Sequence, residues 1–138
     1  MNVEILHEAN QDVFDTLVAG VRAYNIENAG PGNSQPLSVI ARNDSGKLIA
    51  GVSGRTIYRQ FLIEVVWVDS EVRRTGLGRR LMELAESEAK KRGCIAGQVD
   101  TLSFQGPTFY AKLGFEVAGK VEGFPDGHDR YFLLKKYQ

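Results

Sequence analysis

A segment rich in arginine and glycine is the part of the chain best suited to chemistry. Residues 73–79 read Arg-Arg-Thr-Gly-Leu-Gly-Arg and lie between an apolar run, residues 61–68, and an amphipathic helical pattern that extends to about Arg92. The first N–H groups of a helix have no partner inside the helix, and the helix dipole is positive there, so a helix start attracts anions. Gly76 and Gly78 lack a Cβ atom and let a phosphate approach the main chain. The pattern predicts a site for a ligand that carries a diphosphate.

The elements that position this segment follow from hydrophobic periodicity and from turn residues. The expected strands are residues 3–6, 37–42, 47–58, 61–68, 95–102, 115–121 and 130–136. The expected helices are residues 12–28, about 75–92 and 107–113; Asp12 caps the first helix and Gly93 ends the second. The apolar side of the second helix is expected to bury Leu77, Leu81, Leu84 and Ala85, with Met82 flanking them.

The connections between these elements predict the fold class. Short turns, among them Asn-Asp-Ser-Gly at 43–46, join strands 37–42, 47–58 and 61–68 into an antiparallel meander. Strand 95–102 follows through a helix, which makes it a parallel neighbour of strand 61–68. We therefore expect an α/β (α+β) fold with a mixed, mostly antiparallel sheet flanked by helices, in one domain over residues 1–138. Loops 29–36 and 122–129 are expected to border a substrate cleft.

Composition excludes several classes of protein. Seventeen Lys and Arg balance 17 Asp and Glu, which argues against a nucleic-acid binder and makes the arginine cluster a local feature. The single cysteine, Cys94, excludes an internal disulfide, fits a reducing compartment and is expected to be a small core residue. Histidine and cysteine show no metal-site spacing. Without a signal-peptide pattern or an apolar run of roughly 18 residues, the expected location is the cytoplasm, with no membrane partner.

Two motifs resemble those of the GNAT superfamily of N-acetyltransferases. Val68-x4-Arg73-x-x-Gly76-x-Gly78 resembles its acetyl-CoA signature, usually written Gln/Arg-x-x-Gly-x-Gly/Ala. Residues 109–115, Phe-Tyr-Ala-Lys-Leu-Gly-Phe, resemble its Tyr-x-Lys-Leu-Gly-Phe segment, one strand downstream. The order of the expected elements also matches, so the resemblance covers essentially the whole chain. It implies the GNAT fold and transfer of an acetyl group from acetyl-CoA to a primary amine.

The resemblance also implies a binding site for acetyl-CoA as co-substrate, with no metal. The main chain of residues 73–79 would hold the pyrophosphate. That of residues 66–68 would pair with the pantetheine arm like an added strand, one N–H polarising the thioester carbonyl. Gln105 stands where relatives often have an asparagine that touches the arm, and the Trp67 side chain is expected to pack in the core. The predicted cofactor-binding residues are Val66, Trp67, Val68, Arg73, Arg74, Thr75, Gly76, Leu77, Gly78, Arg79 and Gln105.

The candidate catalytic residues are Tyr110 and Glu64. The resemblance places Tyr110 near the thiol, where a tyrosine protonated at neutral pH can act as the general acid. Glu64 is the candidate general base and would act through a water molecule; alternatively, it anchors the ammonium group of the substrate. Relatives that use a glutamate as the base carry it at a position aligned with about Leu62. Asp100, on the adjoining strand, is the second candidate. The expected acceptor is a small molecule or peptide that bears an amine, and it is cationic if Glu64 faces it. Homodimers are common among the relatives, so a homodimer is possible here.

Three other functions share part of this pattern. A CoA-binding sensor or regulatory module without catalysis would carry the same signature, because fold does not fix function. A dinucleotide-binding oxidoreductase would use Gly76 and Gly78 as the first two glycines of its fingerprint, and Asp100 to bind a ribose of the cofactor. The position of the third glycine is Leu81, however, and the gap from Val68 to Gly76 is too long for a tight turn from strand to helix. A nucleoside triphosphatase is excluded because no Gly-Lys-Ser/Thr follows the loop.

Overall fold

The computed structural model describes all residues of the chain, Met1–Gln138. It divides into two compact units, Met1–Gly32 and Asn33–Gln138, and each is described by itself. The first unit holds one helix, α1 (Gln11–Ala29), close to the predicted bounds. Asn10, rather than Asp12, caps it, because its side-chain oxygen accepts a hydrogen bond from the N–H of Val13 at 3.1 Å.

The strand predicted at residues 3–6 is wrong, since this segment forms no strand. Three of its four residues are apolar and two are β-branched, but a strand needs a neighbour to pair with, and the unit Met1–Gly32 contains no other strand. None of the helices in the chain is both long enough and apolar enough to span a membrane.

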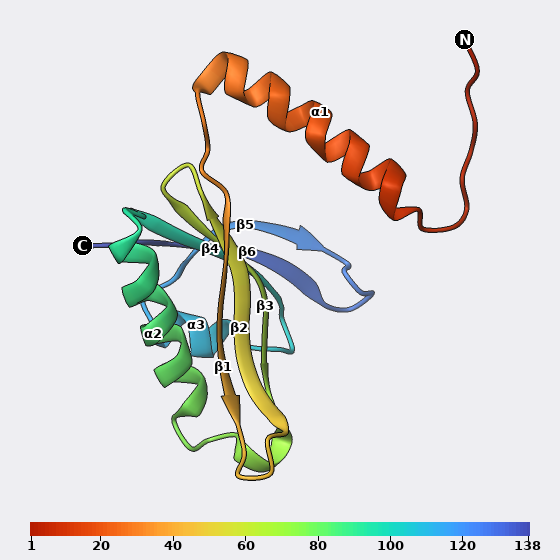
Figure 1. Cartoon of the computed structure of the whole chain (residues 1–138). Helices are drawn as coiled ribbons and strands as arrows, with labels where there is room; N and C mark the ends of the chain where they lie inside the picture. Colours follow the sequence, from red (N-terminus) through yellow and green to blue (C-terminus); the bar gives the residue numbers. More distant parts are fainter. The chain divides into compact units, whose positions relative to one another are not determined.

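The second unit is built on one sheet of six strands (Figure 1). Its strands are β1 (Gln35–Arg42), β2 (Leu48–Ile57), β3 (Gln60–Val68), β4 (Ala96–Leu102), β5 (Glu116–Glu122) and β6 (Asp129–Lys136). Its helices are η1 (Ser70–Val72), α2 (Leu77–Lys91) and α3 (Pro107–Lys112). The predicted elements of this unit are confirmed within about two residues, except for the short 3₁₀ helix η1, which was not predicted.

The strand order is β1-β2-β3-β4-β6-β5. The predicted meander of β1, β2 and β3 is antiparallel, and β3 pairs with β4 in parallel, as predicted. The last strand, β6, lies between β4 and β5 and runs antiparallel to both. The mixed, mostly antiparallel sheet of the predicted fold class is therefore confirmed.

One face of the sheet carries the core and both longer helices of this unit. Figure 1 shows α2 running along β1, β2 and β3, which it contacts. From α2 the core buries Leu81, Met82, Ala85 and Ala89, together with Phe61 and Ile63 of β3 and Tyr110 of α3. The prediction for α2 was wrong in one respect. Leu84 is 49% exposed and Met82 is buried, so Met82, and not Leu84, belongs to the buried face of the helix.

An extra residue in β3 changes which side chains of this strand face the core. Ser53 pairs with Val65 and Gly54 with Ile63, which leaves Glu64 without a partner in a β-bulge. Beyond the bulge, Val66 and Val68 pack against the core. A Cβ atom at Gly54 would lie 2.0 Å from the carbonyl oxygen of Leu62, so only glycine lets the two backbones approach this closely.

We expect Gly54→Ala to lower the free energy of unfolding by about 3 kcal/mol, the upper range for overpacking, because the added methyl group meets rigid backbone. Urea denaturation measures the change. Gly20→Ala in α1, where nothing lies within 4 Å of the added atom, is the matched control and should not destabilise the protein. Equal stability of the Gly54 variant and the wild type would contradict the described bulge.

Candidate active site

The site begins where β3 and β4 separate. Their parallel pairing covers only Gln60–Ala96, Phe61–Gly97 and Leu62–Gln98, although β3 continues to Val68 and β4 to Leu102. From residue 63 onward, the edge of β3 that faces β4 therefore presents unpaired N–H and C=O groups. Such an edge binds an extended ligand as an added strand.

A turn between β3 and α2 lies at the end of this edge. Arg74 has φ 62° and Gly76, the N-cap residue of α2, has φ 84°, so both adopt the left-handed conformation. No side chain caps α2 at its N-terminus. The N–H groups of residues 77–79 are beyond the reach of the helix's own carbonyls and find no acceptor elsewhere in the chain. The turn thus keeps the free amides that anion binding requires.

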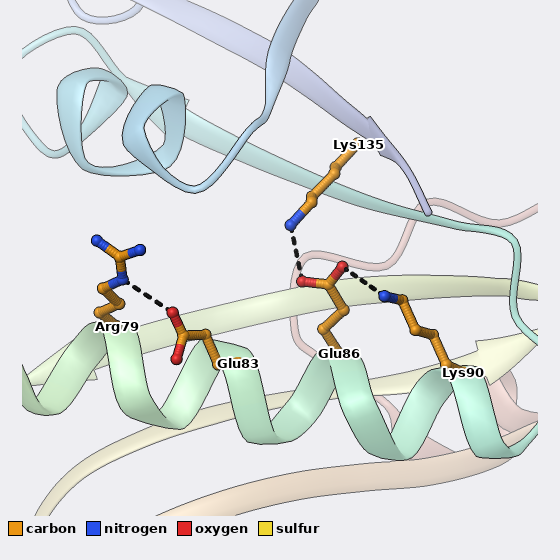
Figure 2. Close-up of polar contacts among 5 residues, drawn as sticks. All are labelled: Arg79, Glu83, Glu86, Lys90 and Lys135. Atoms are coloured by element: carbon orange, nitrogen blue, oxygen red, sulfur yellow. Dashed lines mark hydrogen bonds and ion pairs between the residues drawn. The ribbon is translucent and has the colours of Figure 1, made fainter. Parts of the chain in front are cut away.

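The arginines around this turn differ in how they are held. Arg73 donates from Nε to the carbonyl oxygen of Val68 at 2.9 Å and so fixes the end of β3. Arg79 donates from Nε to Glu83 at 2.8 Å along the helix, as Figure 2 shows. Arg74 and Arg80 form no ion pair within the chain. Arg73 and Arg79 are therefore already engaged in hydrogen bonds within the chain, and Arg74 is the predicted arginine that remains free for a ligand.

The two glycines of the motif have different roles. A Cβ atom at Gly76 would meet nothing within 4 Å, so the main chain there is open to a ligand. A Cβ atom at Gly78 would lie 3.4 Å from the Phe109 ring and from the Val68 side chain. The missing side chain of Gly78 therefore also lets α2 pack closely against β3 and α3, while its N–H remains among the free amides of the turn.

A second polar cluster on α2 holds this helix to the other half of the sheet. The Glu86 carboxylate accepts from Lys135 of β6 at 2.8 Å and lies 3.5 Å from Lys90 (Figure 2). Because α2 packs on β1–β3 while Lys135 belongs to β6, this contact bridges the two halves of the sheet that separate between β3 and β4. Its carboxylate and ammonium are mostly buried, which makes the bridge less sensitive to salt than a surface pair.

Tyr110 lies in the core beneath the separated strands. Its ring makes edge contacts with Phe109 and Phe115, at centroid distances of 5.2 and 5.7 Å. Burial, and secondly the negative charge of Asp100, raise the pKa of Tyr110 to about 12. The hydroxyl therefore keeps its proton throughout the neutral range, as a proton donor must.

The two candidate carboxylates lie on opposite sides of the separation. Glu64 is the bulge residue of β3; its side chain is 64% exposed and lies 4.0 Å from Arg55. Asp100 is on β4 and pairs with Arg130 of β6 at 3.0 Å. Asp100 is close enough to Tyr110 to act on its pKa, so of the two acids it is the one coupled to the predicted proton donor.

Two further predicted residues are found in unexpected settings. Trp67 is 45% exposed and outside the core, because it alternates with Val66 and Val68, which face inward; the predicted core role is wrong. Gln105 accepts through Oε1 from the N–H of Leu102 at 2.9 Å, so only its amide N–H₂ group remains for a ligand.

Sequence reasoning missed Arg130 and its aromatic neighbours. The guanidinium carbon of Arg130 lies 4.7 Å from the ring centroid of Phe132 and 5.3 Å from that of Phe124. Arg130 and Phe132 are two residues apart on one strand and thus on one face, which was the signal available. Phe124 comes from the preceding loop, and nothing in the sequence places it over Arg130.

Comparison with known proteins agrees with this geometry. The model of the acetyltransferase (GNAT) domain family matches residues 35–117. The chain is 35% identical over 107 residues to a blasticidin-S acetyltransferase of Streptomyces morookaense, covering 75% of this chain and 79% of that protein.

Two solved structures show the same fold. A crystal structure of an acetyltransferase from Agrobacterium tumefaciens superposes with a TM-score of 0.93 at 26% identity, over 99% of this chain and 100% of the other. A streptothricin acetyltransferase from Bacillus anthracis, in complex with acetyl coenzyme A, has a TM-score of 0.66 at 21% identity, over 83% and 68% of the two chains.

Proposed function

The chain belongs to the GNAT family of acetyltransferases, and we propose that it moves an acetyl group from acetyl-CoA directly to a primary amine. The observation that carries this proposal is the separation of β3 from β4 beside a helix start with free amides. The unpaired edge suits the extended, amide-containing arm of the coenzyme, and the helix start suits its diphosphate.

The proposed co-substrate contacts are mainly from the main chain. Residues 74–79 would hold the diphosphate, with Arg74 as the free charge beside it. Residues 63–68 would pair with the pantetheine arm, and Gln105 would donate its side-chain N–H₂ group. The complex of the Bacillus anthracis protein with acetyl coenzyme A, on the same fold, supports this choice of co-substrate.

The proposed reaction is a single displacement at the thioester. The amine nitrogen bonds to the acetyl carbon while the bond from carbon to sulfur breaks; nitrogen loses one proton and sulfur gains one. Tyr110 acts as the acid that donates to the departing sulfur, because its proton stays in place at neutral pH. Glu64, whose carboxylate is exposed at the bulge, takes the proton of the amine through water.

The alternative function is a CoA-binding sensor without turnover, and one experiment separates the two. The protein is incubated with acetyl-CoA and a library of primary amines, and released thiol is measured. Thiol release that needs an amine, with an acetylated product in the mass spectrum, supports the transferase. Tight binding of CoA without thiol release for any amine supports the sensor. A cytoplasmic location, a single functional domain over residues 1–138 and dimer formation stay predictions.

The pKa of Tyr110 predicts the alkaline side of the pH profile. The protonated form is the active one, and it is lost only as pH rises through the pKa, which is raised to about 12. We expect kcat/KM for the amine to increase with pH until the pKa of the amine is reached, with no decrease caused by Tyr110 below about pH 11. A decrease that starts near pH 9 in the wild type but not in Tyr110→Phe would mean that Tyr110 titrates normally.

A further inference from the structure

A cavity of about 440 Å³ lies over the face of the sheet opposite α2, in the unit Asn33–Gln138. It is lined by Leu62, Ile63, Gln98, Val99, Asp100, Ala118, Phe132, Leu133 and Leu134. Leu62 and Gln98 form the last pair before β3 and β4 separate, so the cavity begins at the closed end of the candidate active site. Its volume is in the range of sites for small organic molecules.

The polar groups in the lining of this cavity lie on one side of it. Three of its nine residues, Ile63, Val99 and Leu133, also belong to the core on the α2 face. Of the other six, Leu62, Ala118, Phe132 and Leu134 are apolar, and the polar ones, Gln98 and Asp100, come from the same strand, β4. Asp100 supplies the only charge in the lining. A ligand that fits would therefore bury a hydrocarbon or aromatic body and present one hydrogen-bond donor or cation toward β4.

Asp100 is held in place from β6. Its Oδ2 atom lies 3.0 Å from the Arg130 guanidinium, which in turn lies over the rings of Phe124 and Phe132. Phe132 is also the direct partner of Asp100 across the β4–β6 ladder. The aromatic faces favour the cation there, and the ion pair leaves the other carboxylate oxygen, Oδ1, free to accept a hydrogen bond.

We propose that this cavity binds the acceptor, that Asp100 orients its amino group, and that the enzyme therefore prefers primary amines with an apolar or aromatic body. The inference rests on the proposed function and names its substrate class. Arg130 is a positioning residue: it fixes the Asp100 carboxylate by the ion pair at Oδ2, which leaves Oδ1 to accept a hydrogen bond from the neutral amine. The influence of Asp100 on Tyr110 agrees with a location beside the reacting atoms.

The test uses steady-state kinetics with a series of primary n-alkylamines, from ethylamine to hexylamine, together with phenethylamine and glucosamine. We expect KM to fall about threefold to fourfold per methylene group, the value of burying one CH₂, and glucosamine to be the poorest acceptor. Asp100→Asn should raise KM for every amine by about tenfold or more, and leave the dissociation constant of CoA unchanged. Glu122→Gln is the matched control, because Glu122 pairs with Lys120 outside the cavity.

A second variant tests the cavity without touching its charge. Ala118, at a bulge of β5, lines the cavity and is exposed. Ala118→Phe should fill the space and raise KM for hexylamine and phenethylamine by at least about tenfold, while ethylamine is affected less than about twofold. Arg130→Lys, which keeps the charge but loses the planar contact with the rings, should raise KM to a value between those of the wild type and Asp100→Asn.

Failure of this inference can be told apart from failure of the proposed function. Acetyl transfer with KM values that depend neither on chain length nor on Asp100 would overturn the inference and leave the transferase intact. If no amine is acetylated, binding of phenethylamine to the CoA complex is followed by ligand-observed NMR. Binding that Ala118→Phe abolishes supports the cavity as an amine site, and absence of binding to the wild type overturns it.

Discussion

Replacing Tyr110 by phenylalanine is expected to lower kcat by about 10²-fold, the low end of what a positioned acid contributes. The ring keeps its packing between Phe109 and Phe115, and only the hydroxyl is lost. Because that proton is held up to a pKa of about 12, no other ionisation state of the tyrosine contributes at neutral pH. The dissociation constant of acetyl-CoA should stay within about twofold of the wild type, since the hydroxyl acts on the transition state.

Tyr137→Phe is the matched control for this prediction. Tyr137 is also largely buried with a raised pKa, but it packs over Gly97 and beside Lys90, near the paired end of β3 and β4. Its loss of a hydroxyl should leave kcat unchanged. Stopped-flow or steady-state thiol release at saturating amine gives both values. Equal turnover of Tyr110→Phe and the wild type would remove Tyr110 from the mechanism.

Gly76→Glu is expected to weaken CoA binding by at least about 10²-fold, because a carboxylate would stand at the helix start where the diphosphate binds. The space above Gly76 is open, so the side chain fits without a clash, and its charge and bulk oppose the ligand directly. Isothermal titration with CoA measures the loss.

Gly76→Ala separates the charge from the backbone effect. Gly76 has φ 84°, so any side chain there costs about 1–2 kcal/mol of conformational energy. The alanine variant carries that strain without the charge, and its CoA affinity should fall less than about tenfold. If the two variants bind CoA equally, the diphosphate does not lie at the N-terminus of α2, and the proposed placement of the co-substrate is wrong.

The local parts of the site could be predicted from the sequence. Residues 73–79 follow a strand and include the first turn of a helix, and both elements have strong periodicity, so the turn and its free amides follow from nearby residues alone. The same holds for Tyr110 on the short helix that begins at Pro107. The identity of the ligand follows only from the family resemblance, because these patterns alone leave it open.

The long-range parts could not be predicted in the same way. Pairing of β3 with β4 stops after three residue pairs, and this depends on register between segments more than 30 residues apart. The bulge at Glu64 reverses the alternation in β3, which is why Trp67 faces outward instead of packing in the core. Arg130 reaches Asp100 only because β6 inserts between β4 and β5, an order that hydrophobic periodicity does not contain.

The most direct test of this account is a crystal structure of the protein grown with acetyl-CoA. It should show diphosphate oxygens within hydrogen-bond distance of the N–H groups of residues 74–79, the pantetheine arm along residues 63–68 of β3, and the sulfur beside the Tyr110 hydroxyl. A structure in which the coenzyme binds elsewhere, or in which those N–H groups bond to side chains of the protein, would contradict it.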